Sequence, residues 1–182
     1  MAPSLAELLH EWRDFYVLLG SASATLVALL FVAASIGSRV FTEKHVAPLG
    51  AFLTPTVVHF GALLFTSLLA IMPSLSWRVL GGLLAAGGLA GLVYCGWIVV
   101  QMVVRRRFKV DLSDRLFYAL VPTLGYLLLL ASAALLFAQS AMSVDLLAAA
   151  MLVLLLAGIR NAWDMTLWIA ITTPGGRDPP TS

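Results

Sequence analysis

The sequence predicts an all-α integral membrane protein, a polytopic bundle of transmembrane helices preceded by a short amphipathic helix. Two observations predict this fold. Of the 182 residues, 61% are hydrophobic and 11% are charged, which gives the chain more apolar surface than a soluble domain of this length can bury. The apolar residues also gather in stretches of about 20, the length of helix that crosses the hydrocarbon core of a bilayer.

The segment before the first span predicts an interfacial helix. Ser4 and Glu7 have the spacing of a capping box, and apolar residues recur after them at helical intervals. We expect this helix to anchor the chain, with Trp12 and Tyr16 in the aromatic belt at the membrane surface. A partner-binding helix is the alternative. The acidic character of residues 1–14 does not fit the positive start of a cleavable signal peptide.

Five stretches approach or exceed the length of a membrane crossing. They are residues 15–37, 51–72, 79–104, 116–138 and 146–171. The connections between them are short and leave no room for a soluble domain, so we expect a single transmembrane domain over residues 1–182. Pro73 begins a tight connection after the second span, and glycines and prolines mark a loose C-terminal tail.

The positive charges predict how the chain is threaded. Lys and Arg favour cytoplasmic loops, so the basic connection between the third and fourth spans is assigned to the cytoplasm. Five spans then place eight Lys and Arg residues inside and two outside. The inner set is Arg39, Lys44, Arg105, Arg106, Arg107, Lys109, Arg115 and Arg177, and the outer set is Arg13 and Arg78. This predicts an external N-terminus and an internal C-terminus. A four-span alternative moves only Arg160 and Arg177, and charge leaves it open.

Stripes of small residues indicate helix contact faces in the first and third spans. Gly20, Ala24 and Ala28 recur every four residues, and Gly87 and Gly91 have the same spacing. Helices in lipid associate through close packing and polar contacts, so small residues favour such faces. The sequence leaves open whether the facing helix belongs to the same chain or to a partner.

The second span carries a polar face. Thr56, His59, Thr66 and Ser67 fall within one arc of roughly 100° on a helix. A neutral imidazole within a membrane forms local hydrogen bonds, and with an unperturbed pKa near 6.5 it also suits a proton relay. Both a structural and a relaying role remain open for His59.

The last span contains charged residues in the run from Gly158 to Asp164. An unpaired charge within the membrane costs between roughly 3 and more than 10 kcal/mol. Arg160 and Asp164 lie one helical turn apart and can pair, with Asn161 on the same side. Either Arg160 snorkels to the headgroups or the three residues join a buried polar cluster. The candidate pore cluster comprises Thr56, His59, Thr66, Gln101, Arg160, Asn161 and Asp164, with Tyr126 as a further neighbour.

Catalytic and cofactor motifs are absent from the sequence. It contains no His-Glu-x-x-His zinc motif, nucleophile elbow or nucleotide-binding glycine loop, so we expect no enzyme, metal or cofactor. His45 and His59 have a spacing compatible with haem ligation, but facing ligands are missing. The lone Cys95 excludes an intrachain disulfide. The basic residues lie in short loops beside the spans, which indicates membrane topology rather than a nucleic-acid partner.

Three runs of the sequence carry a family resemblance. They are Glu11-Trp-Arg-Asp-Phe-Tyr16, Thr54-Pro-Thr-Val-Val-His-Phe60 and Gly158-Ile-Arg-Asn-Ala-Trp-Asp164. Together they resemble a group of small bacterial membrane proteins without an established activity. The resemblance covers most of the chain and implies a setting in the bacterial inner membrane. It assigns no role to any residue.

The polar residues of the second and last spans predict a function in transport. We expect a homo-oligomeric ion or small-solute channel or transporter whose polar cluster lies in the cytoplasmic half of the membrane. The alternative is a non-catalytic accessory subunit, whose polar residues and small-residue faces bind other membrane proteins. The lipid bilayer is the partner common to both.

Overall fold

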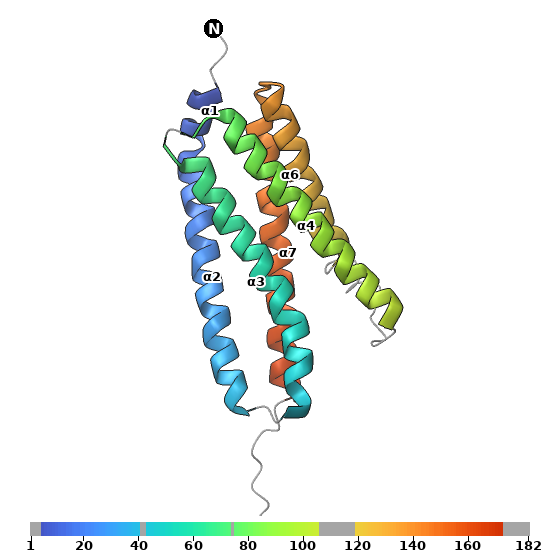
Figure 1. The fold of residues 1–182 in the computed structure, drawn as a ribbon. Coiled ribbons are helices and arrows are strands. Elements are labelled where there is room, and N and C mark those ends of the chain that lie inside the picture. Colours follow the sequence, from blue (N-terminus) through green and yellow to red (C-terminus); the bar gives the residue numbers. More distant parts are fainter. Residues whose placement is uncertain (1–4, 41–42, 74, 106–118, 173–182) are drawn as a thin grey trace, which may run out of the picture.

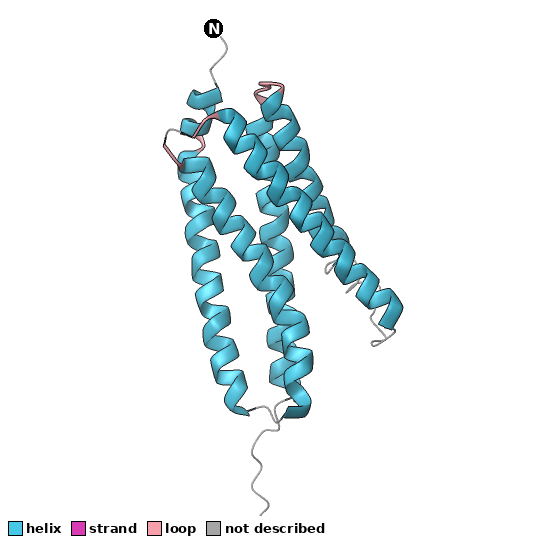
Figure 2. Cartoon of the chain, in the orientation of Figure 1, coloured by secondary structure: helices cyan, strands magenta, loops and turns pink. Residues whose placement is uncertain are grey.

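The structure is a computed structural model that describes residues 5–40, 43–73, 75–105 and 119–172. These residues form six helices and no strand (Figures 1 and 2). The helices are α1 (Leu5–Glu11), α2 (Arg13–Val40), α3 (Glu43–Ile71), α4 (Trp77–Arg105), α6 (Val121–Phe137) and α7 (Met142–Thr172). Four of them, α2, α3, α4 and α7, are long and apolar enough to cross a membrane. The protein is therefore a helical membrane protein.

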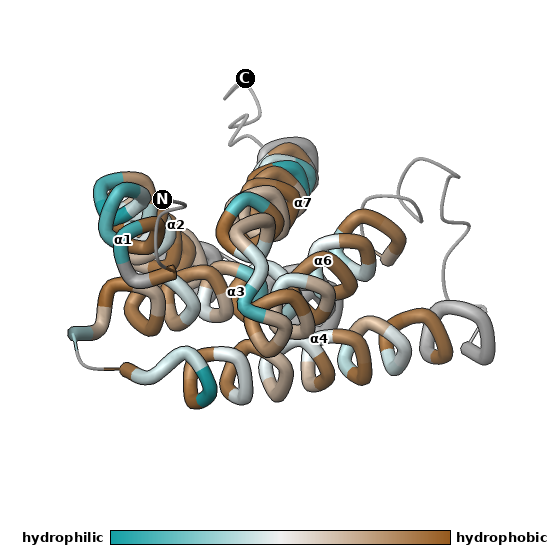
Figure 3. The backbone as a smooth tube through the Cα atoms, turned by 90° about the horizontal axis from the view of Figure 1, so that it is seen from above, coloured by the Kyte–Doolittle hydropathy of each residue, from teal (hydrophilic) through white to brown (hydrophobic). Residues whose placement is uncertain are grey.

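The surface of the bundle is as apolar as its interior. Large hydrophobic side chains such as Leu18, Phe31, Val93 and Leu156 are exposed along the helices, and Figure 3 shows hydrophobic residues along all of the long helices. A soluble protein rarely leaves so much continuous apolar surface uncovered, whereas a bilayer covers it. The exposed Ser21, together with other hydroxyls on α2, donates a hydrogen bond to a carbonyl four residues back in its own helix.

The long helices alternate in direction, and α7 lies between two pairs. One pair is α2 with α3, the other is α4 with α6, and α7 packs against both α3 and α6 (Figure 1). The consecutive helices α3 and α4 contact each other only slightly, and α4 diverges from α2 and α3 while it stays packed against α6. The neighbours in space therefore follow the order α2, α3, α7, α6, α4.

A glycine lies at each of the four main helix interfaces. At α6–α7, a methyl group added to Gly125 would lie 2.7 Å from the Leu154 side chain, too close for real carbon atoms. The pairs are Gly20 with Ser67 at α2–α3, Gly158 with Phe60 at α3–α7, Gly125 with Leu154 at α6–α7, and Gly91 with Tyr126 at α4–α6. Small residues thus permit the close approach on which helix association in lipid depends.

The helix ends near α1 are held by local hydrogen bonds. The backbone amide of Trp12 bonds the Leu8 carbonyl, so the chain runs from α1 into α2 with little interruption. Ser76 Oγ accepts from the Val79 amide at the start of α4. Between α6 and α7 the chain reverses at Gln139, which has a positive φ of 54°. These connections fix one end of the bundle, here called the α1 end; the opposite end is the far end.

Candidate functional site

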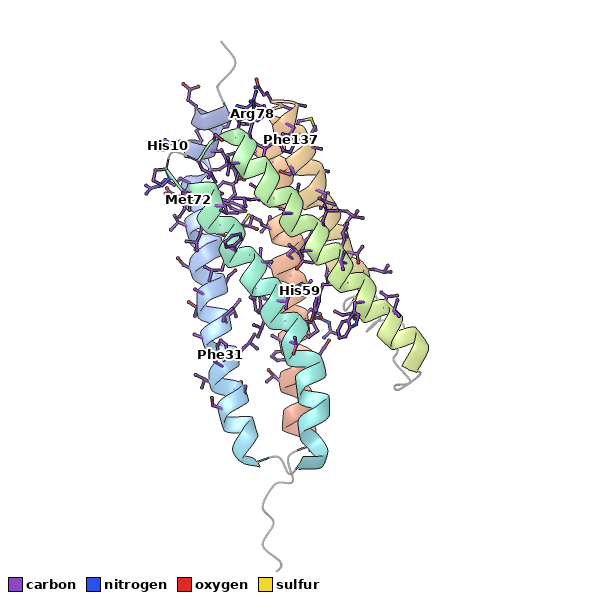
Figure 4. All side chains as sticks on the ribbon, in the orientation of Figure 1. His10, Phe31, His59, Met72, Arg78 and Phe137 are labelled. Carbon is purple, nitrogen blue, oxygen red and sulfur yellow. The ribbon has the colours of Figure 1, made fainter. Side chains whose placement is uncertain are left out.

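His59 is the centre of a polar site inside the bundle. It lies on α3 with no exposed surface, and its Nδ1 is 3.0 Å from the hydroxyl oxygen of Tyr126 on α6. Figure 4 shows its side chain within the bundle, away from the lipid-facing surface. The hydrogen bond joins the α2–α3 pair to the α4–α6 pair directly. The sequence placed Tyr126 as a neighbour of this cluster, and the structure brings the two rings together.

Tyr126 reaches His59 because α4 has no side chain in its way. A Cβ at Gly91 would lie 2.2 Å from the Tyr126 ring, so the ring occupies the space above this glycine. Cys95, one turn along α4, is close enough to interact electrostatically with Tyr126. The tyrosine is 1% exposed, and its hydroxyl is hydrogen-bonded to His59. Packing therefore orients the group that holds His59.

Asn161 of α7 occupies the same level of the interior. Phe60 packs on Gly158, where an added Cβ would lie 2.6 Å from the ring. From this contact, His59 is one residue and Asn161 three residues toward the far end, which separates them by about 3 Å along the bundle axis. Asn161 has no exposed surface, and neither its Nδ2 nor its Oδ1 has a hydrogen-bond partner among the described residues.

Arg160 and Asp164 form an ion pair along α7. Their side chains are 37% and 21% exposed, so the pair lies at the margin of the interior. The second carboxylate oxygen of Asp164, Oδ2, is buried without a partner in the described part of the chain. Trp163 lies on the exposed face of α7. The charged run therefore divides: Arg160 and Asp164 pair at the margin of the interior, and Asn161 lies in the core.

The other candidate residues on α3 also face inward. Thr56 has no exposed surface, Thr66 is buried, and Ser67 is buried against Gly20 of α2. The arc of polar residues expected on the second span is thus an interior face. Gln101 lies in α4, but its side chain is outside the described residues.

The expected packing residues have two different surroundings. Gly20 and Gly91 lie at close helix contacts. Ala24 and Ala28 are exposed on α2, and Gly87 is exposed on α4 with open space where a Cβ would be. Within the chain, the face of α2 that contacts α3 includes Gly20, and the two alanines lie outside this face.

Several polar residues of the interior were not singled out from the sequence. Tyr16, expected in the aromatic belt, is completely buried. Ser23 and Ser143 are also buried. Their hydroxyl oxygens have no hydrogen-bond partner within the described ranges. A single hydroxyl in an apolar stretch gives no sign of which way it faces, because bonds to the helix's own carbonyls satisfy it equally well on the lipid side.

The described side chains contain no group of three or more His, Cys, Asp and Glu residues that could hold a metal ion. Comparison with known proteins finds no family model that matches the chain, no similar curated protein and no similar solved structure.

Proposed function

We propose that the protein is a membrane channel or transporter for an ion or small polar solute, acting as a homo-oligomer in a bacterial inner membrane. The observation that carries the proposal is the pair His59 and Asn161, two fully buried polar side chains at one level with unpartnered atoms. An unpaired buried polar group costs about 1–3 kcal/mol, so such groups persist where they meet water or a permeating species.

The roles of the site residues follow from their positions. The Nδ1 atom of His59 is hydrogen-bonded to Tyr126, so the buried Nε2 atom is the group that binds the transported species or gates its passage. Asn161 offers both a donor and an acceptor. Arg160 pairs with one carboxylate oxygen of Asp164, and the other oxygen remains available to the transported species. Ionisable groups within membrane helices commonly serve transport in this way.

Flux measurements test the proposal. Purified protein in lipid vesicles should pass at least one member of a panel of Na⁺, K⁺, Cl⁻, protons and small neutral solutes. His59→Ala and Asn161→Ala should each reduce that flux by about tenfold, the equivalent of roughly 1.4 kcal/mol in the barrier. The matched control is Thr25→Val, which removes an exposed hydroxyl bonded only to its own helix. Folded protein that passes no member of the panel would overturn the proposal.

We also propose five spans, with the N-terminus outside and the C-terminus inside. α6 supports this count, since it is an apolar helix of 17 residues that packs along both α4 and α7 and exposes Leu124 and Leu127 to lipid. Its length of about 26 Å approaches the thickness of the hydrocarbon core. A reporter fused after Ser182 should be active in the cytoplasm; activity on the external side contradicts this threading.

An accessory subunit is the second candidate, and the outer face of α4 favours it. Gly82, Ala86 and Ala90 are exposed there at four-residue spacing, together with Gly87. Such a face suits close packing against another membrane helix, either a second copy or a different subunit. This role predicts a stoichiometric partner that co-purifies from native membranes and is lost in Ala86→Leu. Purification of the chain alone, with flux intact, contradicts it.

A further inference from the structure

In the described part of the chain, buried polar atoms without partners lie on three of the helices. In the described residues they belong to seven side chains on α2, α3 and α7, and to none on α4 or α6. The seven are Tyr16, Ser23, His59, Ser67, Ser143, Asn161 and Asp164. Native proteins pair nearly all of their buried polar groups, so this concentration at one set of interfaces marks a site rather than scattered defects.

Six of these seven side chains, all except Ser143, follow one another along the bundle axis. Gly20 lies against Ser67, and α2 and α3 run in opposite directions (Figure 1). At 1.5 Å per residue, Tyr16 is then about 6 Å nearer the α1 end than Ser67, and Ser23 about 4.5 Å nearer the far end. His59 follows about 7.5 Å beyond Ser23 on the same scale. Asn161 and Asp164 continue the row on α7.

A carboxylate stands at each end of this row. Asp145 is exposed in the first turn of α7, at the α1 end of the bundle, where α2 begins with Tyr16 in its first turns. Asp164 lies 19 residues later, which corresponds to about 28 Å along the helix, close to the thickness of the hydrocarbon core. The row therefore extends over the distance that a transported species must cross.

The chemistry of the row suits protons. Hydroxyls, a neutral imidazole and an amide each donate and accept hydrogen bonds, and one bridging water extends the reach between two groups to roughly 5–6 Å. The widest axial gap, about 7.5 Å between Ser23 and His59, is comparable to the reach of two waters in a line. The packing does not suit hydrated ions, because α2–α3 and α3–α7 are in direct contact at Gly20 and Gly158.

Building on the proposed function, we propose that the transported species is the proton and that its path is the row Tyr16, Ser67, Ser23, His59, Asn161 and Asp164. A proton enters at Asp145 and passes through hydroxyls and waters to Nε2 of His59. In this path Nδ1–H donates to the Tyr126 oxygen, so Nε2 takes up the proton on its lone pair and releases it to water at Asn161, and one proton leaves at Asp164. The imidazole returns to its neutral form, and its Nδ1 stays on Tyr126 throughout. Cys95 and Tyr94, the other titratable groups near Tyr126, lie on the α4 side of that ring, away from the path.

Proton flux into vesicles carrying an internal pH-sensitive dye, at a potential set by K⁺ and valinomycin, tests this path. The unchanged protein should conduct protons with no accompanying Na⁺ or Cl⁻ flux. Asn161→Leu should reduce conduction by about tenfold or more, because an apolar side chain interrupts the row. Ser23→Ala should reduce it severalfold while leaving the fold undisturbed. Its matched control is Ser132→Ala, an equally buried serine whose hydroxyl is already bonded to the Ser143 carbonyl.

The outcomes separate this inference from the proposed function. Flux of another ion or solute without proton flux overturns the proton path and leaves a transporter standing. Proton flux that survives both Asn161→Leu and Ser23→Ala shows that the path lies elsewhere. An absence of flux for every probe rejects both proposals. Thermal unfolding in detergent verifies that each variant is folded before its flux is compared.

Discussion

The α4–α6 pair and the α2–α3–α7 group differ in whether their polar side chains have hydrogen-bond partners. In the first, Thr123 donates to the Ala119 carbonyl at 2.6 Å, Ser132 donates to the Ser143 carbonyl at 2.8 Å, and Tyr126 bonds His59. In the second, seven buried side chains carry atoms without a partner in the described chain. Both regions use glycines to bring apolar helices together.

This difference distinguishes polar side chains that stabilise an apolar bundle from polar side chains that serve its function. A hydroxyl with a protein partner stabilises its own interface, and its removal should cost stability and leave flux unchanged. A polar group with no protein partner adds little stability to the fold, and its removal should cost flux. Substitutions in the two regions should therefore have opposite consequences for stability and flux.

Gly91→Ala should be the most damaging small substitution. The new methyl group would lie 2.2 Å from the Tyr126 ring, which would have to leave its position and release His59. Overpacking of this kind costs about 3 kcal/mol. The matched control is Gly87→Ala four residues earlier, where the methyl meets open space and should raise helix stability by up to about 1 kcal/mol. Unfolding in mixed micelles compares the two, and equal effects would contradict the close contact at Gly91.

Asn161→Leu should have a smaller effect on stability and of the opposite sign. Leucine replaces an amide whose two polar atoms lack partners among the described residues, so we expect the free energy of unfolding to stay level or rise by about 1–2 kcal/mol. Flux should fall in the same variant. A loss of stability similar to that of Gly91→Ala would show that Asn161 has a structural role, and the contrast between the two regions would not hold at this position.

The sequence predicted the positions of the long helices well. It predicted poorly which side of each helix faces the interior of the bundle. Hydropathy indicates α2, α3, α4 and α7 because a membrane helix needs a long apolar stretch. It does not indicate which side faces protein, since lipid and the bundle interior are equally apolar and hydrophobic periodicity carries little signal. Polar residues that share one arc of a helix carry more signal. Their clustering on the second span predicted the interior face of α3 that contains His59.

The small-residue stripe of α2 shows why spacing alone was not enough. Residues four apart drift by about 40° around a helix, so Ala28 is turned about 80° from Gly20. The interior face instead follows Tyr16, Gly20 and Ser23, which mixes a large aromatic residue with two small ones. Tyr16 was assigned to the membrane surface because such residues favour that position. Its burial depends on the contacts of α2 with its neighbours, which no local pattern encodes.

Serine to alanine substitutions at two equally buried positions make the most direct comparison of the regions. Ser132→Ala should lower the free energy of unfolding by about 1 kcal/mol because it removes a hydrogen bond of 2.8 Å between α6 and the start of α7. Ser23→Ala should change it by less than about 0.5 kcal/mol, since no protein group in the described chain bonds its hydroxyl. Chemical denaturation of both variants in one detergent measures the difference, and a larger loss at Ser23 would reverse the assignment.

An effect smaller than that of Ser132→Ala is expected at the turn between α6 and α7, where the two regions are joined. Gln139 has a φ of 54°, a left-handed conformation that glycine adopts at low cost after a helix and that a side chain resists. The amides of Gln139 and Ser140 bond the carbonyls of Leu136 and Leu135, which holds the turn in place. Gln139→Gly should therefore raise the free energy of unfolding by about 0.5–1 kcal/mol, with flux unchanged because the turn lies off the row. Ala138→Gly next to it, where φ is −81°, should instead lower stability. An equal loss in both variants would mean that the turn is held by contacts of the glutamine side chain, and the α6–α7 junction would then belong with the partnered region.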